Sequence, residues 1–252
     1  MKILLTNDDG ISSQGIRLFA RALRDAGHRV FTVAPDTNRS GCSHSILFLD
    51  KPLKLSEIEE DTWSCSGTPA DCVITALLGG IHEICLSTEG KTLNMERAPD
   101  LVLSGINAGA NLGTDIVYSG TAAAARQGSI FGIPSIAFSL VGSERPYQWE
   151  TIISYIIEKL ISIMGYWKAG TFVNVNFPNT EKKPSALVQT FLSMRYYNDR
   201  IVTFTAPEGS KYCFAKAGKV ENVPEDGSDW AEVLKGNAAF SLVMTQPAIV
   251  NE

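Results

Sequence analysis

The sequence predicts an α/β protein with a parallel sheet, and three observations near its N-terminus carry this prediction. Residues 3–5 form an apolar run, typical of a strand that is buried on both faces. Residues 13–27 then carry an amphipathic helical pattern, and residues 28–35 form a second strand-like run that stops at Pro35. Because strand, helix and strand follow one another within about 35 residues, we expect a βαβ unit whose two strands are parallel.

The first helix is defined by one apolar face and by residues suited to its two ends. The apolar side chains recur at the i, i+3, i+4, i+7 spacing of a helical face, at Ile16, Phe19, Ala20 and Leu23. Ser13 is a candidate cap for the start of this helix, and Gly27 suits its end.

A second helix is expected to begin at Thr68, with Pro69 at its first position and Asp71 at its third, and to run through Leu78. The polar stretch 81–98 has little periodicity, and we interpret it as a surface excursion. The later predicted elements are a strand at 100–103, a helix opened by 119–121, a strand at 134–138, a helix at 151–164 and a strand at 171–177.

The chain loses its βαβ rhythm from about Pro184 onward. Short strand-like pieces and glycines replace the alternating strands and helices. We therefore expect a catalytic core at 1–183 and a C-terminal extension at 184–252, interpreted as an antiparallel extension or a dimer arm.

Composition limits the classes of partner. The 252 residues are 44% hydrophobic, and a formal charge of -5 argues against a nucleic-acid-binding surface. The five cysteines are odd in number and lack CxxC spacing, which argues against a disulfide framework or a zinc site and favours the cytoplasm. The chain opens with a strand rather than a signal-like segment, and no apolar run reaches the roughly 18 residues of a membrane span.

The adjacent carboxylates Asp8 and Asp9 are the most informative local feature. They follow the first strand and precede Gly10, so they are expected at the carboxyl edge of the sheet, where α/β proteins bind ligands. Two neighbouring carboxylates repel each other unless a cation neutralises them, and a hard divalent cation prefers oxygen ligands. A simple turn is the alternative, since Asn-Asp-Asp-Gly also suits a turn.

Two further loops follow predicted strands: NRSG, 38–41, and SGINAGANLG, 104–113. If the strand at 101–103 lies beside the first strand and opposite the second, Asn107 and Ser40 converge on the two aspartates at a switch point. The glycines of the second loop allow backbone N–H groups to approach an anion, although an ordinary glycine-rich connection is the alternative. Residues 119–121 open a helix whose N-terminus favours phosphate, whereas Ser119 serving only as a cap is the simpler interpretation.

Five motifs, taken together, resemble the SurE family (survival protein E). They are NDDG, APDTNRSGCSHS, GTPADCV, SGINAGANLG and YSGTAAAA, in the family's order and spacing. The match is strong over residues 1–140 and weak beyond them. The resemblance implies a Rossmann-like three-layer α/β/α core and a metal-dependent 5′-nucleotidase, which hydrolyses nucleoside 5′-monophosphates to nucleoside and phosphate. It also implies a homodimer or homotetramer.

The same resemblance implies the residues of the site. The metal ligands are expected to be Asp8, Asp9, Ser40 and Asn107, which would hold one divalent ion per subunit (Mg²⁺, Mn²⁺ or Ca²⁺). Asp8, Asp9 and Asn107 are also the expected catalytic residues. The residues expected beside the phosphate are Asn38, Gly41, Asn111, Ser119, Gly120 and Thr121.

The chain departs from the family pattern at two places near the expected site. Residues 11–15 are Ile-Ser-Ser-Gln-Gly, where small or His-Pro-like residues are usual, and residues 126–128 are Arg-Gln-Gly, where an acidic residue usually precedes the glycine. Both changes affect the expected rim of the pocket, and neither removes an expected ligand. The C-terminal part keeps a trace of the family in Ser-Asp-Trp, 228–230, and Phe-Ser-Leu, 240–242.

The expected mechanism is attack by a metal-activated water that one of the two aspartates orients or deprotonates. A covalent aspartyl route requires a DxD pattern, which the adjacent Asp8 and Asp9 lack. His44 is a candidate general acid to the leaving oxygen, although a lone loop histidine is more often part of a pocket wall. Tyr118, Tyr196 and Tyr197 are candidates to stack on a base, although packing in the fold or at a subunit contact is favoured.

Two other classes of function fit the sequence less well. A non-hydrolytic nucleotide-binding or regulatory protein would use the same crevice, but a pure binder needs no paired carboxylates. An NAD-dependent oxidoreductase is disfavoured because GxGxxG is absent after the first strand, and the aspartates there would repel a pyrophosphate.

Overall fold

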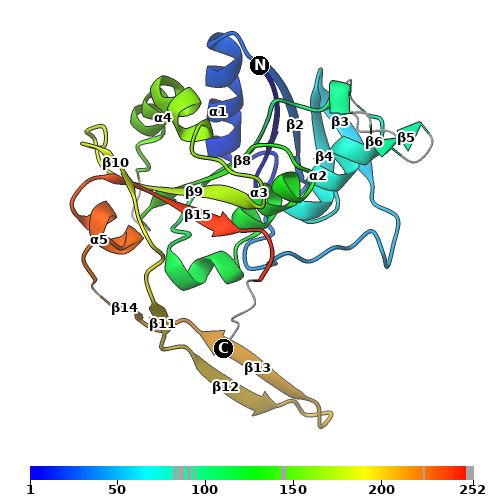
Figure 1. Cartoon of the computed structure of the whole chain (residues 1–252). Coiled ribbons are helices and arrows are strands. Elements are labelled where there is room, and N and C mark those ends of the chain that lie inside the picture. The colour runs from blue at the N-terminus through cyan, green and yellow to red at the C-terminus, as the bar shows by residue number, and fades with distance from the viewer. Residues whose placement is uncertain are drawn as a thin grey trace, which may run out of the picture.

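The computed structural model describes residues 1–81, 84, 88–89, 92–93, 95–142, 146–223 and 225–247. Over these residues a nine-stranded sheet has the order β10-β15-β9-β8-β7-β1-β2-β4-β3. The central parallel strands are β1 (Lys2–Thr6), β2 (Arg29–Pro35), β4 (Thr62–Cys65), β7 (Leu101–Asn107), β8 (Ser135–Val141) and β9 (Thr171–Pro178). The predicted α/β class with a mostly parallel sheet is therefore confirmed (Figure 1).

The strand order reverses at β1. It pairs in parallel with β2 on one side and with β7 on the other, as the register Leu4↔Phe31 and Leu4↔Val102 shows. The chain first builds outward from β1 through β2, and later builds outward in the other direction through β7, β8 and β9. The expected switch point is confirmed, and it places the loops after β1 and β7 side by side.

Helices cover both faces of the sheet. On one face, α1 (Gln14–Asp25) and α4 (Trp149–Met164) share a core that includes Phe19, Phe138 and Ile156. On the other face, α2 (Pro69–Leu78) packs with α3 (Gly120–Ile130) against β2 and β7, around Phe31 and Val102. The three layers are visible in Figure 1. Because strands between two helical layers are apolar on both sides, β1 and β7 read as near-continuous apolar runs.

The helix starts follow the local sequence. Thr68 caps α2 and forms a capping box with Asp71, as its position before Pro69 suggested. Ser13 occupies the N-cap position of α1, but its hydroxyl accepts a hydrogen bond from Asn7 Nδ2 at 2.8 Å instead of capping the helix. The expected apolar stripe of α1 is buried along its whole length.

The C-terminal part contributes both to the sheet and to a protruding arm. β10 (Leu187–Gln189) and β15 (Ala238–Met244) extend the central sheet, with β15 antiparallel to β9, and α5 (Asp229–Leu234) precedes β15. The antiparallel pairs are β11 (Arg195–Tyr197) with β14 (Val220–Asn222) and β12 (Arg200–Thr205) with β13 (Lys211–Lys216), and they form the arm in Figure 1. The domain boundary at residue 183 stays a prediction, although β10 and β15 join the same sheet as the core.

Some elements were not predicted. The edge hairpin of β3 (Leu55–Glu59) with β4 and the 3₁₀ helix at Gly113–Val117 lie in segments without clear periodicity. The expected surface excursion at 81–98 lies partly outside the described residues, and its described part contains β5 (Thr88–Glu89), β6 (Thr92–Leu93) and a 3₁₀ turn at Met95–Arg97.

Candidate active site

The loop after β1 is fixed by the buried side chain of Asn7. Its Nδ2 donates to the Gly10 carbonyl at 3.0 Å, and its Oδ1 accepts from the Gly10 N–H at 3.2 Å. Gly10 has a φ of +98°, a conformation that favours glycine. This closed turn holds the two aspartates at the carboxyl edge of the sheet, so the predicted turn is present and leaves the aspartates where a ligand site was expected.

Asp8 is 3% exposed, and the N-terminus of α3 lies against it. Its Oδ1 accepts a hydrogen bond from the Thr121 hydroxyl at 2.5 Å. A Cβ at Gly120 would lie 2.9 Å from the Cβ of Asp8, so only glycine permits this approach. Burial is the main reason that the pKa of Asp8 rises to about 6; the charge of Asp9 adds to the rise, and the Thr121 hydrogen bond opposes it.

Within the described residues, Asp9 is not part of the lining of the cavity to which Asp8 belongs. Its Oδ2 accepts from the Ala108 N–H at 3.1 Å, and burial raises the pKa of this carboxyl. Asp9 and Ala108 line a neighbouring cavity of about 700 Å³ together with Tyr147 and Trp149. The two aspartates therefore differ in surroundings, as expected for adjacent residues at the end of a strand.

A cavity of about 200 Å³ lies between the loops after β1, β2 and β7. Its lining in the described chain comprises Asp8, Ser40, Gly41, Asn107, Ala110, Asn111, Asp115, Tyr118, Ser119 and Tyr197. Six of the predicted site residues meet here: Asp8, Ser40, Gly41, Asn107, Asn111 and Ser119. The other four predicted residues, Asp9, Asn38, Gly120 and Thr121, are outside this lining and support it from behind or beside it.

Hydrogen bonds connect the loop after β2 to the segment that precedes α3. Ser40 is exposed, and its N–H donates to Asn38 Oδ1 at 2.8 Å. Ser43 donates through its N–H to the Tyr118 carbonyl at 2.9 Å and through its hydroxyl to the Val117 carbonyl at 2.7 Å. These bonds bring Ser40 next to the loop that precedes α3.

His44 lies in the same loop but outside the cavity lining. Its Nε2 is 2.8 Å from Gln127 Oε1, and burial lowers the pKa of the imidazole. Its role as a general acid stays a prediction. Gln127, the hydrogen-bond partner of His44, is one of the residues at which the chain departs from the family pattern.

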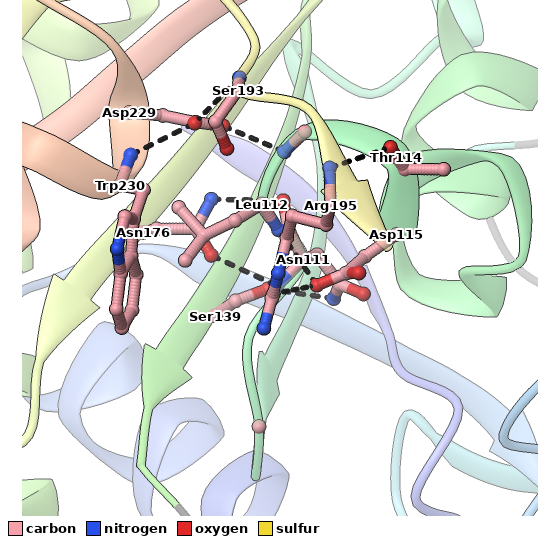
Figure 2. A network of polar contacts seen from close by, with 12 residues as sticks. Asn111, Leu112, Thr114, Asp115, Ser139, Asn176, Ser193, Arg195, Asp229 and Trp230 are labelled. Atoms are coloured by element: carbon pink, nitrogen blue, oxygen red, sulfur yellow. Dashed lines mark hydrogen bonds and ion pairs between the residues drawn. The ribbon is translucent and has the colours of Figure 1, made fainter. Parts of the chain in front are cut away.

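Two asparagines of the loop after β7 are positioned differently. Asn107 donates from Nδ2 to the Gly109 carbonyl at 3.1 Å, which leaves its amide oxygen for a ligand. Asn111 donates from Nδ2 to Ser139 Oγ at 2.8 Å and from its backbone N–H to Asn176 Oδ1 at 2.9 Å. β8 and β9 therefore fix Asn111 from beneath (Figure 2).

Residues from the C-terminal part complete one wall. Asp115 accepts hydrogen bonds from Arg195, Tyr197 and the Leu112 N–H, the last at 3.2 Å. The side chains of Asp115 and Arg195 are 9% and 10% exposed. Burial and the hydrogen bond to Asp115 raise the pKa of Tyr197 to about 12, so this phenol stays protonated and donates.

The buried carboxylate of Asp229 is a second tie between the same segments (Figure 2). It accepts from the backbone N–H groups of Gly113, Ser193 and Trp230, at 2.8, 2.9 and 2.8 Å. Gly113 has a φ of +49°, and a Cβ there would lie 1.8 Å from the Ser193 carbonyl oxygen. The loop after β7 is thus clamped against residues that are distant in sequence.

The N-terminus of α3 borders the cavity. Ser119 is the N-cap and accepts from the Ala122 N–H at 3.0 Å, and it also lines the cavity, so its expected place beside the phosphate stays a prediction. The Thr121 hydroxyl is directed to Asp8 rather than to the cavity.

The donor set fits a hard cation. Asp8, Ser40 and Asn107 offer carboxylate, hydroxyl and amide oxygens to one cavity, with Asp9 beside it. Within the described residues, no group of three or more His, Cys, Asp or Glu side chains could hold a metal, so the oxygen donors of Ser40 and Asn107 would have to complete any site at Asp8. The raised pKa of the buried Asp8 reflects a carboxylate whose ionised form lacks a compensating charge, which a cation would supply.

Two lining residues, Ala110 and Asp115, were not predicted from the sequence, whereas Tyr118 and Tyr197 were candidates to stack on a base although packing was favoured. Tyr118 directly precedes the Ser-Gly-Thr motif, and this position in the sequence indicated that it lies near the site. Asp115 and Tyr197 are separated by 82 positions, and their pairing depends on tertiary structure that no local pattern in the sequence encodes.

The comparisons with known proteins agree in one family. The model of the family "Survival protein SurE" matches residues 3–199. A protein from Vibrio cholerae serotype O1 named "5′-nucleotidase SurE" is 40% identical over 94% of this chain and 88% of its own length. One of the same name from Stenotrophomonas maltophilia is 38% identical over 96% of this chain and 88% of its own.

Among solved structures, the SurE protein from Aquifex aeolicus has a TM-score of 0.78 and 35% identity, and the match covers 98% of this chain and 95% of that chain. Its fold agrees with the one described above. A family model that spans most of the chain, relatives at about 40% identity and this structural likeness lead to one conclusion: the chain belongs to the SurE family.

Proposed function

We propose that this chain is a metal-dependent phosphomonoesterase that hydrolyses nucleoside 5′-monophosphates to nucleoside and phosphate. The observation that carries the proposal is the convergence of Asp8, Ser40 and Asn107 on one small polar cavity at the strand switch point. The name "5′-nucleotidase SurE" of its relatives gives the reaction class and the substrate class.

We infer that Asp8, Asp9, Ser40 and Asn107 would hold one divalent ion per subunit, Mg²⁺, Mn²⁺ or Ca²⁺. Such an ion supplies Lewis acidity toward a phosphate oxygen and lowers the pKa of a bound water. The support for this ligand set is the match between its oxygen donors and the preference of hard cations.

The protein's own groups would then position the reactants. One of Asp8 and Asp9 orients the attacking water or accepts its proton; the fixed orientation of Asp9 against Ala108 suits such a role. Asn107 offers an amide oxygen on the opposite loop. The residues proposed to surround the phosphate are Asn38, Gly41, Asn111, Ser119, Gly120 and Thr121, at or behind the N-terminus of α3.

We also propose a homodimer or homotetramer that uses the protruding arm. An isolated two-stranded hairpin is marginally stable in water, yet β12 and β13 expose apolar side chains along their length. Phe204 stacks on Tyr212 and Phe214, with ring centroids 5.5 and 5.7 Å apart, and all three rings are about half exposed. A second copy of the chain would cover this surface.

No helix among the described residues has the length and apolarity that a membrane span requires. We propose a cytoplasmic location on the basis of the odd number of cysteines without paired spacing.

The test of the proposed reaction is a panel of phosphomonoesters assayed against several divalent metals. We expect phosphate release from nucleoside 5′-monophosphates with Mg²⁺ or Mn²⁺, loss of this activity with EDTA, and recovery when metal is returned. Nucleotide binding without metal-dependent turnover would overturn the proposal in favour of a regulatory protein.

A further inference from the structure

Two tyrosine rings lie at the rim of the cavity that Asp8 lines. Tyr118 precedes α3 and is 56% exposed, and Tyr197 ends β11 and is 42% exposed. Both line the cavity, whose remaining wall is made of small or polar residues such as Ser40 and Asn111. A phosphate group requires no aromatic surface, whereas a nucleobase is flat and stacks on aromatic rings. The two tyrosines therefore suit a flat, aromatic part of a ligand, which the polar residues of the cavity do not.

Tyr197 is held in place before any ligand arrives. Its hydroxyl donates to Asp115, which also receives the guanidinium of Arg195. The backbone N–H of Arg195 donates to Thr114 Oγ1 at 3.1 Å, which fixes the strand itself. A ring that is already ordered loses little conformational entropy when a base stacks on it.

The neighbouring residue on the same strand provides a contrast. Tyr196 is 53% exposed but does not line the cavity. Successive side chains of a strand point to opposite faces, so Tyr196 and Tyr197 cannot serve the same ligand. Tyr196 is consequently a matched control of equal type and similar exposure.

A second aromatic surface borders the site beyond Asp9. Tyr147 and Trp149 line the cavity of about 700 Å³, but their rings pack on each other with centroids 5.0 Å apart, and the Tyr147 hydroxyl donates to the Ala108 carbonyl at 3.4 Å. This cavity contains none of Asp8, Ser40 and Asn107. The rings that share a cavity with the proposed phosphate-binding residues are Tyr118 and Tyr197.

We propose that Tyr118 and Tyr197 bind the base of the nucleotide substrate, so that the C-terminal extension contributes a residue to substrate recognition. This inference rests on the proposed function and deepens it by naming the group that is recognised. Aromatic stacking engages the face of a base, which every base has, so the pair accepts both purines and pyrimidines.

The test compares adenosine 5′-monophosphate with glycerol 3-phosphate, which has no base, at saturating Mn²⁺. We expect Tyr197→Ala and Tyr118→Ala each to raise KM for the nucleotide about tenfold, with unchanged KM for glycerol phosphate and little change in kcat. Tyr197→Phe keeps the ring and should stay within about threefold of the wild-type KM. The control Tyr196→Ala should match the wild type.

Equal effects on both substrates, or an unchanged nucleotide KM in both alanine variants, would overturn the inference. A raised nucleotide KM confined to Tyr147→Ala would assign the base to the other cavity and overturn it too. A wild-type protein that hydrolyses neither substrate would instead contradict the proposed function. In that event calorimetry with adenosine alone still decides: we expect the Kd of Tyr197→Ala to rise about tenfold, and an equal Kd refutes base stacking.

Discussion

Asp8 combines almost complete burial with a charge that nothing in the protein fully neutralises. Its one strong partner is the Thr121 hydroxyl, and Asp9 adds a second negative charge next to it. Desolvation dominates, so the pKa of Asp8 rises from 3.8 to about 6. Such a carboxyl opposes folding of the metal-free protein when it is ionised, and a bound cation reverses this effect.

The raised pKa of Asp8 determines how the stability of the metal-free protein changes with pH. Because the folded pKa exceeds the unfolded one, the free energy of unfolding falls as pH rises from about 4 to about 6, by about 3 kcal/mol in total for this group. Asp8→Asn removes the penalty. In EDTA at pH 7.5 we expect the variant to be about 1–3 kcal/mol more stable than the wild type, and no more stable at pH 4.

Urea unfolding at the two pH values measures this difference. Asp25→Asn is the control, because the Asp25 side chain is 73% exposed and pairs only on the surface with Arg21. A variant that is destabilised at pH 7.5, or that gains equally at both pH values, would contradict the account of Asp8.

At the scale of elements, the loop after β7 is shaped by segments that come much later in the chain. β8 and β9 hold Asn111 through Ser139 and Asn176, and the N-terminus of α5 holds Gly113 through Asp229. Asp229 accepts from two buried backbone N–H groups and from the part-buried Trp230 N–H, so it ties α5 to the segment at Ser193 and to the site loop.

Removing this carboxylate should therefore loosen the site as well as the fold. We expect Asp229→Ala to lower the free energy of unfolding by about 3–5 kcal/mol, because it leaves two buried donors and the part-buried Trp230 N–H without this acceptor. Amide hydrogen exchange at Gly113 should accelerate in the same variant. Asp226→Ala is the matched control: the Asp226 side chain is 91% exposed and pairs with Lys235 on the surface, so its loss should leave the free energy of unfolding close to that of the wild type.

Equal stability of Asp229→Ala and Asp226→Ala, or unchanged amide hydrogen exchange at Gly113, would show that Asp229 does not hold the loop after β7. Urea unfolding and exchange measured by mass spectrometry supply the two readouts.

The sequence predicts elements well where one local rule determines them. The strand before Asp8, the helix after Thr68 and the strand before Asn107 each combine an apolar pattern with a clear start or stop, and all three occur. Convergence of their loops followed because parallel strands end at the same edge of a sheet. The 3₁₀ helix at Gly113–Val117 was not predicted, since its Asp115 is satisfied by Arg195 and Tyr197 from a distant strand.

For the whole molecule, the C-terminal part contributes strands to the central sheet. β10 has only three residues, and β15 lies in a part of the sequence without βαβ rhythm, so neither was predicted as a strand of this sheet, yet both extend it beyond β9. The same part supplies Tyr197 to the cavity and Asp229 to the loop after β7. The C-terminal part therefore contacts the site directly, while its β11/β14 and β12/β13 pairs form the protruding arm (Figure 1).

We propose that the cavity at the strand switch point, with Asp9 beside it, holds a divalent ion through Asp8, Asp9, Ser40 and Asn107. Calorimetric titration of the chelator-treated protein with Mn²⁺ tests it most directly, with Asp8→Asn, Asn107→Ala and the control Asp25→Asn alongside the wild type. We predict one Mn²⁺ per chain for the wild type and the control, with weaker binding as pH falls below about 6, and at least tenfold weaker binding in the two site variants. Mn²⁺ binding of wild-type strength in Asp8→Asn and Asn107→Ala would contradict the account.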